Sequence, residues 1–334
     1  MKSTQPPFPA AECPALAASW AASRRLLTAL RTELGALGPL PGGVTLAAVG
    51  SLGRREAHQA SDFDLVAVAE DGTAASAALA PVFALAAQLG LALPKARGIY
   101  RDVLPRSQLC PSAGRGSLQE SPAAFGRRMA LLLDAQPLGP ASALRKLQRE
   151  VLRWYAAGKV GRVPEAQWGF LLHDLQRYAH AYAAWQDFRF DHAADDAWLL
   201  RQAKLAGSRL LTFAGLLCLL GASSTLGLGK GRWVQARLAL TPLQRLRTVM
   251  EPVDPVGFGL LCADYEALHA RLADPAKRDE LVRASPSSFA ESLRPGAAQR
   301  EIQRLGASLR RRIAGFLLAR RRDWHPDFFA GLFF

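Results

Sequence analysis

The spacing of apolar residues in the first third of the chain predicts one long helix and three buried strands. Residues 11–37 repeat apolar side chains with a helical period and place arginines on the polar side, which is typical of an amphipathic helix. The continuous apolar runs 44–49 and 65–69 predict two strands, and residues 97–104 predict a third. Prolines and glycines at 39–43 end the helix and turn the chain into the first strand.

Helical periodicity dominates the rest of the chain. It predicts helices over residues 73–89, 122–135, 141–157, 165–190, 195–221, 241–251, 256–272 and 298–321. The segment 106–121 is expected to be a loop, and the Pro- and Gly-rich stretch 136–140 is expected to join two domains. The aromatic segment 324–334 is expected to pack on the helices. The predicted fold class is α+β, with a small mixed-sheet domain at 1–138 followed by an all-α helical bundle at 139–334.

The segment 49–56, which reads Val-Gly-Ser-Leu-Gly-Arg-Arg-Glu, overlaps the end of the first predicted strand. Glycine at position 50 allows backbone N–H groups to approach a phosphate closely, and the hydroxyl of Ser51 adds a donor. A short helix beginning near Leu52 would direct the positive end of its dipole at the same anion. Gly50 and Ser51 are therefore candidates for phosphate binding.

Two acidic residues, Asp62 and Asp64, precede the second predicted strand. Side chains two positions apart in an extended chain point to the same face, so both carboxylates reach one site while Phe63 and Leu65 face the core. Paired carboxylates suit Mg²⁺ or Mn²⁺, because these hard cations prefer oxygen ligands and are often coordinated by protein carboxylates and substrate phosphates together. Gly-Ser and Asp-x-Asp pairs also occur in ordinary turns and helix caps, but here they follow one another beside apolar runs.

At these residues the chain resembles the nucleotidyltransferase superfamily that includes DNA polymerase beta, whose signature is Gly-Ser, a loop and then Asp-x-Asp on a strand. The wording of 50–56 and 61–64 is most similar to the branch around bacterial PII-protein uridylyltransferase and glutamine-synthetase adenylyltransferase. Residues 127–133, 170–178 and 204–217 resemble the helical half of uncharacterised bacterial nucleotidyltransferases in that neighbourhood. The resemblance covers most of the chain in patches.

The resemblance implies a Mg²⁺- or Mn²⁺-dependent enzyme that passes NMP from an NTP to a hydroxyl group and releases pyrophosphate. In such an enzyme Gly50 and Ser51 bind the β- and γ-phosphates, while Asp62 and Asp64 ligate the metal. The acceptor is a protein side chain, by analogy with the uridylyl- and adenylyltransferases, or an RNA end. The alternative is a regulatory protein of the same fold that binds a nucleotide without turnover.

A third carboxylate is expected to help activate the acceptor hydroxyl. Asp102, on the third predicted strand, is the first choice for this catalytic role, and Glu120 is the second. Relatives tend to carry acidic and glycine residues in the loop where this chain has Ser-Ala-Gly-Arg-Gly-Ser-Leu-Gln-Glu at 112–120. This departure weakens the case for a catalytic acid on the loop.

Further candidates for phosphate contacts lie outside the turn. Arg54 and Arg55 follow the Gly-Ser turn after two residues, and one of them is also a candidate partner for Glu56. Lys204, Ser208 and Arg209 share one face of a predicted helix, and they resemble a basic motif of the related nucleotidyltransferases. The candidate nucleotide-binding residues are Gly50, Ser51, Arg54, Arg55, Lys204, Ser208 and Arg209.

The dipeptide His173-Asp174 is a feature of metal phosphohydrolases, which need further His and Asp ligands that one dipeptide does not supply. Asp174, Arg177 and His180 share a helical face, where they either line the cleft opposite the triphosphate or form a surface ion pair. The segment 192–196 is interpreted as a solvated turn that caps the next helix.

The formal charge of +14 is uneven, because residues 1–140 carry +3 and residues 141–334 carry +11. A basic surface attracts anionic partners, including NTP, RNA and acidic proteins, or serves only as a solvated face. Four scattered cysteines predict reduced thiols of a cytoplasmic protein, and the first 14 residues lack the apolar run of a signal peptide. The apolar run 210–220 is too short to span a bilayer, so a buried helix is expected there.

Overall fold

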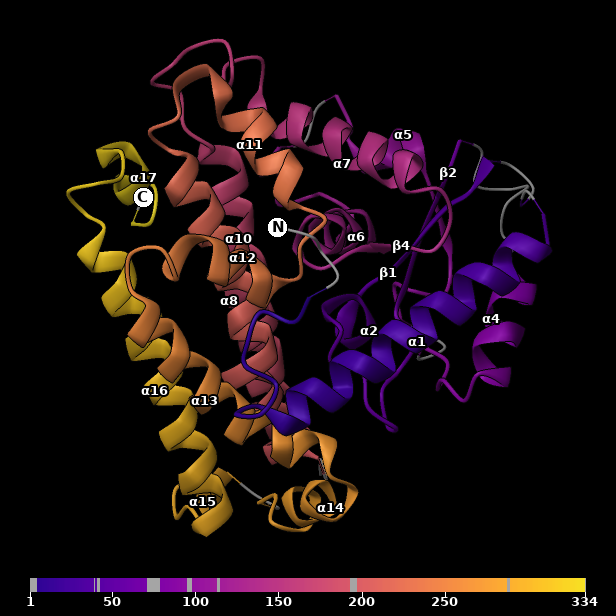
Figure 1. The fold of residues 1–334 in the computed structure, drawn as a ribbon, viewed down its shortest axis with the longest axis vertical. Coiled ribbons are helices and arrows are strands. Elements are labelled where there is room, and N and C mark those ends of the chain that lie inside the picture. Colours follow the sequence, from indigo (N-terminus) through magenta and orange to yellow (C-terminus); the bar gives the residue numbers. More distant parts are fainter. Residues whose placement is uncertain are drawn as a thin grey trace.

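The N-terminal half of the molecule is built on a small mixed β-sheet (Figure 1). The computed structural model describes residues 5–38, 40, 43–70, 79–94, 98–112, 115–192, 197–286 and 289–333. In these residues β1 runs antiparallel to β2 and β4, and β3 runs parallel to β2. The strands are β1 (Thr45–Ala48), β2 (Leu65–Ala69), β3 (Val103–Pro105) and β4 (Gln136–Pro137), in the order β3-β2-β1-β4.

Helices make up most of the described chain. Those around the sheet are α1 (Pro14–Ala36), α2 (Gly50–Arg54), α4 (Leu79–Gln88), α5 (Arg106–Leu109) and α6 (Pro122–Leu133). Those that follow are α7 (Ala141–Ala156), α8 (Gly169–His192), α9 (Trp198–Lys204), the π-helical turn η3 (Leu205–Arg209), α10 (Leu210–Ser223), the 3₁₀ turn η4 (Gly227–Gly229), α11 (Lys230–Arg237), α12 (Pro242–Met250), α13 (Pro255–Ala273), α14 (Pro275–Arg283), α15 (Phe289–Ser292), α16 (Ala297–Ala319) and α17 (Pro326–Ala330). The fold is therefore α+β, with a small sheet and predominant helix.

Side chains of β2 alternate between the two faces of the sheet and enter two separate cores. Leu65 and Ala67 belong to the smaller core, which α1 and α4 complete. Val66 and Val68 point the other way, into the larger core that α6 and the downstream helices share. A strand buried on both faces carries a continuous apolar run, which explains why residues 65–69 show no polar alternation.

One boundary expected from the sequence is wrong. The third strand begins at Val103, so Asp102 lies just before it rather than on it. The stretch predicted as a domain junction begins with β4, which pairs with Ala47 and Ala48 of β1. A strand of two residues carries no periodicity that a sequence pattern could reveal. The start of the predicted helix over 73–89 and most of the predicted turn at 192–196 lie outside the described residues.

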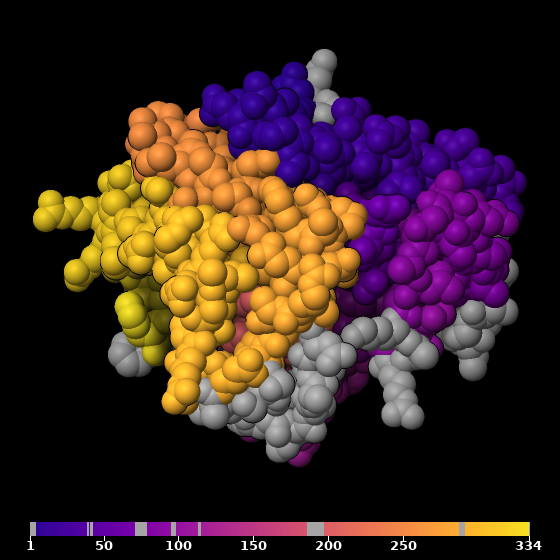
Figure 2. Space-filling model, turned by 90° about the horizontal axis from the view of Figure 1, so that it is seen from below, coloured from indigo at the N-terminus to yellow at the C-terminus, as the bar shows by residue number. Residues whose placement is uncertain are grey.

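The two halves of the chain share the larger core, which includes residues from Phe8 to Phe328. Buried Arg245 of α12 donates to the carbonyls of Leu132 and Leu133 at 2.8 and 2.7 Å, at the end of α6. In the other direction, Glu266 of α13 accepts hydrogen bonds from the first N–H groups of α1. Figure 2 shows the N-terminal segments and the C-terminal helices meeting along a seam on one face.

The predicted helix over 195–221 corresponds to the continuous stretch from α9 through η3 to α10. In the described part of the chain, this stretch, Trp198–Ser223, is the one helix long and apolar enough to cross a membrane, and 67% of its most apolar window is buried inside the fold. A core helix of a folded domain has this placement.

The aromatic segment near the C-terminus packs on the helices, as predicted. The Trp324 ring lies edge-on to Phe316 and Phe328, with centre distances of 6.1 and 5.4 Å. The ring also lies against Gly221 of α10, where a Cβ would lie 2.1 Å from the indole. The close approach of ring and helix explains why this position is a glycine.

Candidate active site

The turn after β1 brings its backbone directly against Asp64. Gly50 has a φ of +67°, and a Cβ at this position would lie 2.4 Å from Oδ2 of Asp64. The N–H of Val49 donates to the carbonyl oxygen of Asp64 at 3.0 Å, which holds the end of β1 beside the start of β2. Glycine therefore allows the turn and the carboxylate to approach this closely.

Asp62 and Asp64 line one polar pocket of about 110 Å³ together with Ser51. Between the two acids, Phe63 is fully buried and packs edge-on against Phe83, with ring centres 6.4 Å apart. Because Phe63 is anchored in the core, the flanking carboxylates turn to the opposite side. Asp62 is exposed and Asp64 is partly buried, so the pair extends from the mouth of the pocket inward.

The opposite wall of the pocket comes from the C-terminal half of the chain. Lys204, Ser208 and Arg209 line it, at the point where α9 passes into η3. Hydrogen bonding in a π turn reaches one residue further than in an α-helix, so positions 208 and 209 both stay on the side of position 204. The fold thus brings the basic helical motif against the Gly-Ser turn and the acidic pair.

Lys204 lies among more positive than negative charge. Burial, Arg278 and Arg209 lower its pKa to about 8, against the opposing effect of Asp62. The pKa of His58, another residue of the pocket, is lowered to about 4 by burial, Arg278 and Lys204. One guanidinium nitrogen of Arg278, on α14, is buried with no hydrogen-bond partner among the described residues. This excess of positive charge favours an anionic ligand.

The surroundings of Asp64 disfavour the ionised form of its carboxylate. Burial raises its pKa to about 6; Arg209 opposes the shift, and Asp62 and Asp134 add to it. No hydrogen bond from the described residues reaches its side chain to offset the burial. A cation bound beside this carboxylate would relieve both the burial and the repulsion.

Arg209 is the charged centre of a cluster of tyrosines. Burial opposes its charge, but Tyr182, Tyr178, Tyr100 and Asp134 outweigh this effect and raise its pKa. The guanidinium lies 4.9 Å from the centre of the Tyr182 ring, and the hydroxyl of Tyr178 is hydrogen-bonded to Tyr100. Arg209 therefore stays charged at the pocket wall.

The two arginines after the turn have different environments. Arg54 lines the pocket, but its guanidinium donates to Glu56 at 2.8 Å and to Asp134 at 2.9 Å, so most of its charge is neutralised. The expected pairing of one arginine with Glu56 is thus confirmed. Arg55 does not line the pocket. Its guanidinium lies instead 4.7 Å from the centre of the Trp20 ring.

The acids predicted to complete the pair lie elsewhere. Asp102 is exposed and does not line the pocket, and its carbonyl oxygen accepts a hydrogen bond from Arg127 at 2.9 Å. Besides Asp62, the acid that raises the pKa of Asp64 is Asp134, which follows α6 and is 3% exposed. Sequence reasoning missed Asp134 because its position depends on β4, which is too short to recognise from a pattern.

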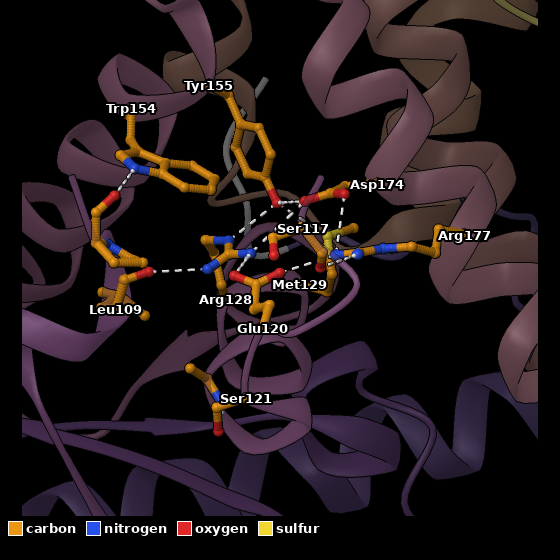
Figure 3. Close-up of polar contacts among 12 residues, drawn as sticks. Leu109, Ser117, Glu120, Ser121, Arg128, Met129, Trp154, Tyr155, Asp174 and Arg177 are labelled. Carbon is orange, nitrogen blue, oxygen red and sulfur yellow. Dashed lines mark hydrogen bonds and ion pairs between the residues drawn. The ribbon is translucent and has the colours of Figure 1, made fainter. Parts of the chain in front are cut away.

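Glu120, Asp174 and Arg177 belong to a buried ion network instead (Figure 3). Arg128 is fully buried, contacts the Glu120 carboxylate and donates to the Tyr155 hydroxyl at 2.9 Å. Tyr155 in turn donates to Asp174 at 2.6 Å, and Arg177 bridges Asp174 and Glu120 at 3.1 and 2.8 Å. Asp174 and Arg177 were expected either to line the cleft or to form an ion pair at the surface, and this buried network is neither of these.

Comparison with protein-family models, curated proteins and solved structures finds no significant match. The function must therefore be inferred from the chemistry of the site.

The acidic pair fits a divalent cation that is shared with a ligand. No group of three or more His, Cys, Asp or Glu side chains with metal-binding geometry occurs in the described ranges, including around His173. Mg²⁺ is commonly held by one or two carboxylates together with substrate phosphates and waters, rather than by a complete protein cage. Asp62 and Asp64 supply the carboxylates, and the surrounding cations favour the phosphates.

Proposed function

We propose that this protein is a Mg²⁺-dependent nucleotidyltransferase, which transfers NMP from an NTP to a hydroxyl group and releases pyrophosphate. One observation carries the proposal: the Gly-Ser turn and the acidic pair share a pocket with a basic helical turn distant in the sequence. Catalysis of phosphoryl-group chemistry depends mainly on positioning and on stabilising charge, and this pocket offers side chains for both. The resemblance of the motif to the DNA polymerase beta superfamily supports the same activity.

The residues of the pocket divide into two roles. Ser51 and the backbone beside Gly50 would contact the β- and γ-phosphates, and Lys204 and Arg209 would balance their charge. Asp62 and Asp64 would hold Mg²⁺ or Mn²⁺, which supplies polarisation of the α-phosphate and stabilisation of the leaving pyrophosphate when it is bound.

The proposed acceptor is a protein side chain or an RNA end, and the proposed location is the cytoplasm. The location is supported by the cysteines, which are free thiols and largely buried, because secreted proteins usually form disulfides. These residues are Cys13, Cys110, Cys218 and Cys262.

A labelling experiment tests the proposal. The purified protein is incubated with each α-labelled NTP and Mg²⁺ or Mn²⁺, in the presence of cell lysate or total RNA. Label should appear on a protein or an RNA, and Asp62→Asn and Asp64→Asn should abolish it while the fold persists. Asp323→Asn, an exposed acid paired with Arg320 far along the chain, is the matched control and should label normally. Unchanged labelling by either pocket variant would remove that residue from the mechanism.

The second candidate function is nucleotide binding without turnover. The placement of three acids favours it: Asp102 lies outside the pocket, Glu120 pairs with two arginines, and Asp134 pairs with Arg54. General-base assistance is typically worth about 10²–10⁴ in rate, so a protein without it turns over slowly. Mg²⁺-dependent NTP binding with no transfer of label to any acceptor would support this reading.

A further inference from the structure

An apolar groove lies between α16, which runs along one edge of the molecule, and α17 (Figure 1). It encloses about 750 Å³, and most of the side chains that line it are apolar, among them Leu317 and Leu332. Two further lining residues are largely open to water: Leu318 of α16 is 66% exposed, and Phe333, which follows α17, is 75% exposed. A hollow with exposed apolar walls is typical of a site that receives apolar side chains of a partner.

The groove is fixed in shape by core contacts. Trp324, which holds α17 against Phe316 of α16, also stacks on Phe329 with a centre distance of 6.2 Å and an angle of 24°. Phe329 lines the groove and packs edge-on against buried Phe328, with ring centres 5.3 Å apart. Because these walls are already ordered, a partner would bind without paying to form them.

The helix beside the groove carries a strong excess of positive charge. Residues 297–322 contain eight arginines and one acid, Glu301, which pairs with Arg271. Two of the eight pair with acids, Arg312 with Asp264 and Arg320 with Asp323. The other six are exposed and form no ion pair within the described part of the chain: Arg300, Arg304, Arg310, Arg311, Arg321 and Arg322.

The unpaired arginines continue the same face of α16 that lines the groove. Arg311 precedes Ala314 by three residues and Leu318 by seven, and Arg304 precedes Arg311 by seven. Residues at these steps lie above one another on a helix. The exposed face of α16 is therefore basic in its middle and apolar toward its C-terminal end. We call the groove together with Arg304, Arg310 and Arg311 the α16 surface.

The charge around the groove selects the partner's sign. Arg321 lines the groove itself, and Arg322 follows it. The acids in this region are Asp323, which pairs with Arg320, and Asp327 at the start of α17, whose side chain is 71% exposed. The positive charges outnumber the negative ones, so a complementary partner carries acidic residues next to its apolar ones.

Other anionic partners fit this surface less well. Single-stranded RNA binds by stacking its bases on exposed rings, but among the described residues that line the groove Phe333 is the one exposed ring. An anionic membrane takes up apolar side chains that project from a helix face, whereas here the apolar residues line a hollow. A hollow instead accepts side chains that project from another protein.

We propose that the α16 surface binds an acidic amphipathic helix of a partner protein. The wall of the groove from Ala314 to Arg321 spans about 10 Å, which matches the distance between apolar side chains at positions i and i+7 of a bound helix. Acidic side chains on the following turns of that helix would face Arg311, Arg310 and Arg304. The inference goes beyond the proposed nucleotidyl transfer and does not depend on it.

The test uses a synthetic helical peptide with leucines at i, i+3, i+4 and i+7 and glutamates at the exposed positions. A second peptide carries lysine in place of each glutamate. Affinities for the full-length chain are measured by fluorescence anisotropy at low and high salt. The glutamate peptide should bind and should weaken as salt is raised, because its ion pairs lie at an exposed rim. The lysine peptide should not bind.

Substitution of the apolar wall tests the groove. Leu318→Ser should weaken the glutamate peptide by about 10- to 100-fold, since a large apolar side chain no longer packs against it. Leu260→Ser, at a position of α13 that is 46% exposed, is the matched control and should leave the affinity unchanged. Both positions are exposed, so the variants should unfold at the same temperature as the parent protein.

Charge reversal tests the basic part of the surface. The double variant Arg310→Glu and Arg311→Glu should weaken the glutamate peptide by about 10-fold and flatten its salt dependence. Arg145→Glu with Arg149→Glu, on the exposed side of α7, changes the net charge equally and should retain the parent affinity.

Several results would overturn the proposal. These are no binding of the glutamate peptide, equal binding of the lysine peptide, or equal losses in the control variants. Tighter binding of single-stranded RNA or of phosphatidylserine vesicles, abolished by the Arg310 and Arg311 double variant, would assign the surface to another class of partner. A dimer in sedimentation velocity that Leu318→Ser dissociates would show that a second copy of the chain occupies the groove.

Discussion

At Gly50 the backbone of the turn lies directly against the carboxylate of Asp64, which leaves no room for a side chain. Gly50→Ala should abolish Mg²⁺-dependent NTP binding, because the new Cβ would lie 2.4 Å from Oδ2 of Asp64 and displace it. It should also lower the free energy of unfolding by at least about 1 kcal/mol, since alanine is disfavoured at a φ of +67°. Gly35→Ala in α1 meets no atom within 4 Å and should be neutral or stabilising in the same assays. Normal NTP affinity in Gly50→Ala would show that the close approach is dispensable.

Lys204 gives the pocket a pH dependence. Its charge is opposed by burial, Arg278, Arg209 and Arg54 and favoured by Asp62, with the result that its pKa is lowered to about 8. The lysine is therefore charged below pH 8 and neutral above it, so NTP affinity should fall as the pH rises through 8. Phosphate groups, with a second pKa of about 6, are already ionised in that range and do not produce the fall.

Titration of NTP binding between pH 7 and 10 checks this expectation. Lys204→Arg keeps its charge throughout and should flatten the profile, whereas Lys146→Arg, on the exposed side of α7, should retain the parent profile. A parent profile that is already flat would mean that Lys204 does not contact the phosphates.

Local sequence patterns located some residues of the pocket and missed others. Asp62 and Asp64 were recognisable because a strand period of two fixes their common side. His269 was not, because its place in the pocket depends on the packing of α13. Arg55 was predicted at the pocket because it adjoins Arg54, but a left-handed φ of 62° turns it toward Trp20.

At the scale of elements, buried charge fastens α6, α7 and α8 to one another. Arg128→Met should lower the free energy of unfolding by about 3–5 kcal/mol, because it leaves carboxylates of Glu120 and Asp174 buried with fewer partners. Arg106→Met is the matched control: this arginine pairs with Glu70 and Glu150 at the surface, so its loss should cost less than about 1 kcal/mol. Chemical denaturation of both variants measures the difference, and equal losses would contradict a special role for the buried network.

Element types were more predictable than element details. Long amphipathic helices such as α1, α7 and α16 follow from their apolar period, and each begins and ends close to its predicted bounds. The π turn at Leu205–Arg209 was invisible, because it changes the hydrogen bonding without changing the apolar composition. Lys204, Ser208 and Arg209 line the pocket at this turn.

At the scale of the whole molecule, one hydrophobic core and several hydrogen bonds extend across the predicted division at 138/139. Arg245 caps the carboxyl end of α6 from the C-terminal side, and Glu266 caps the amino end of α1. The pocket is itself formed by both halves.

Fragments 1–138 and 139–334 should therefore fail to fold separately. Each would expose to water its share of the larger core, and the sheet of the first would lose the helices that cover one face. We expect neither fragment alone to show a cooperative thermal transition by circular dichroism, and the full chain to unfold in one transition. Mg²⁺-dependent binding of an NTP should be absent from both fragments, because Asp62 and Asp64 are separated from Lys204 and Arg209. A fragment 1–138 that melts cooperatively would instead establish it as an independent domain, with the pocket formed by docking of two folded units.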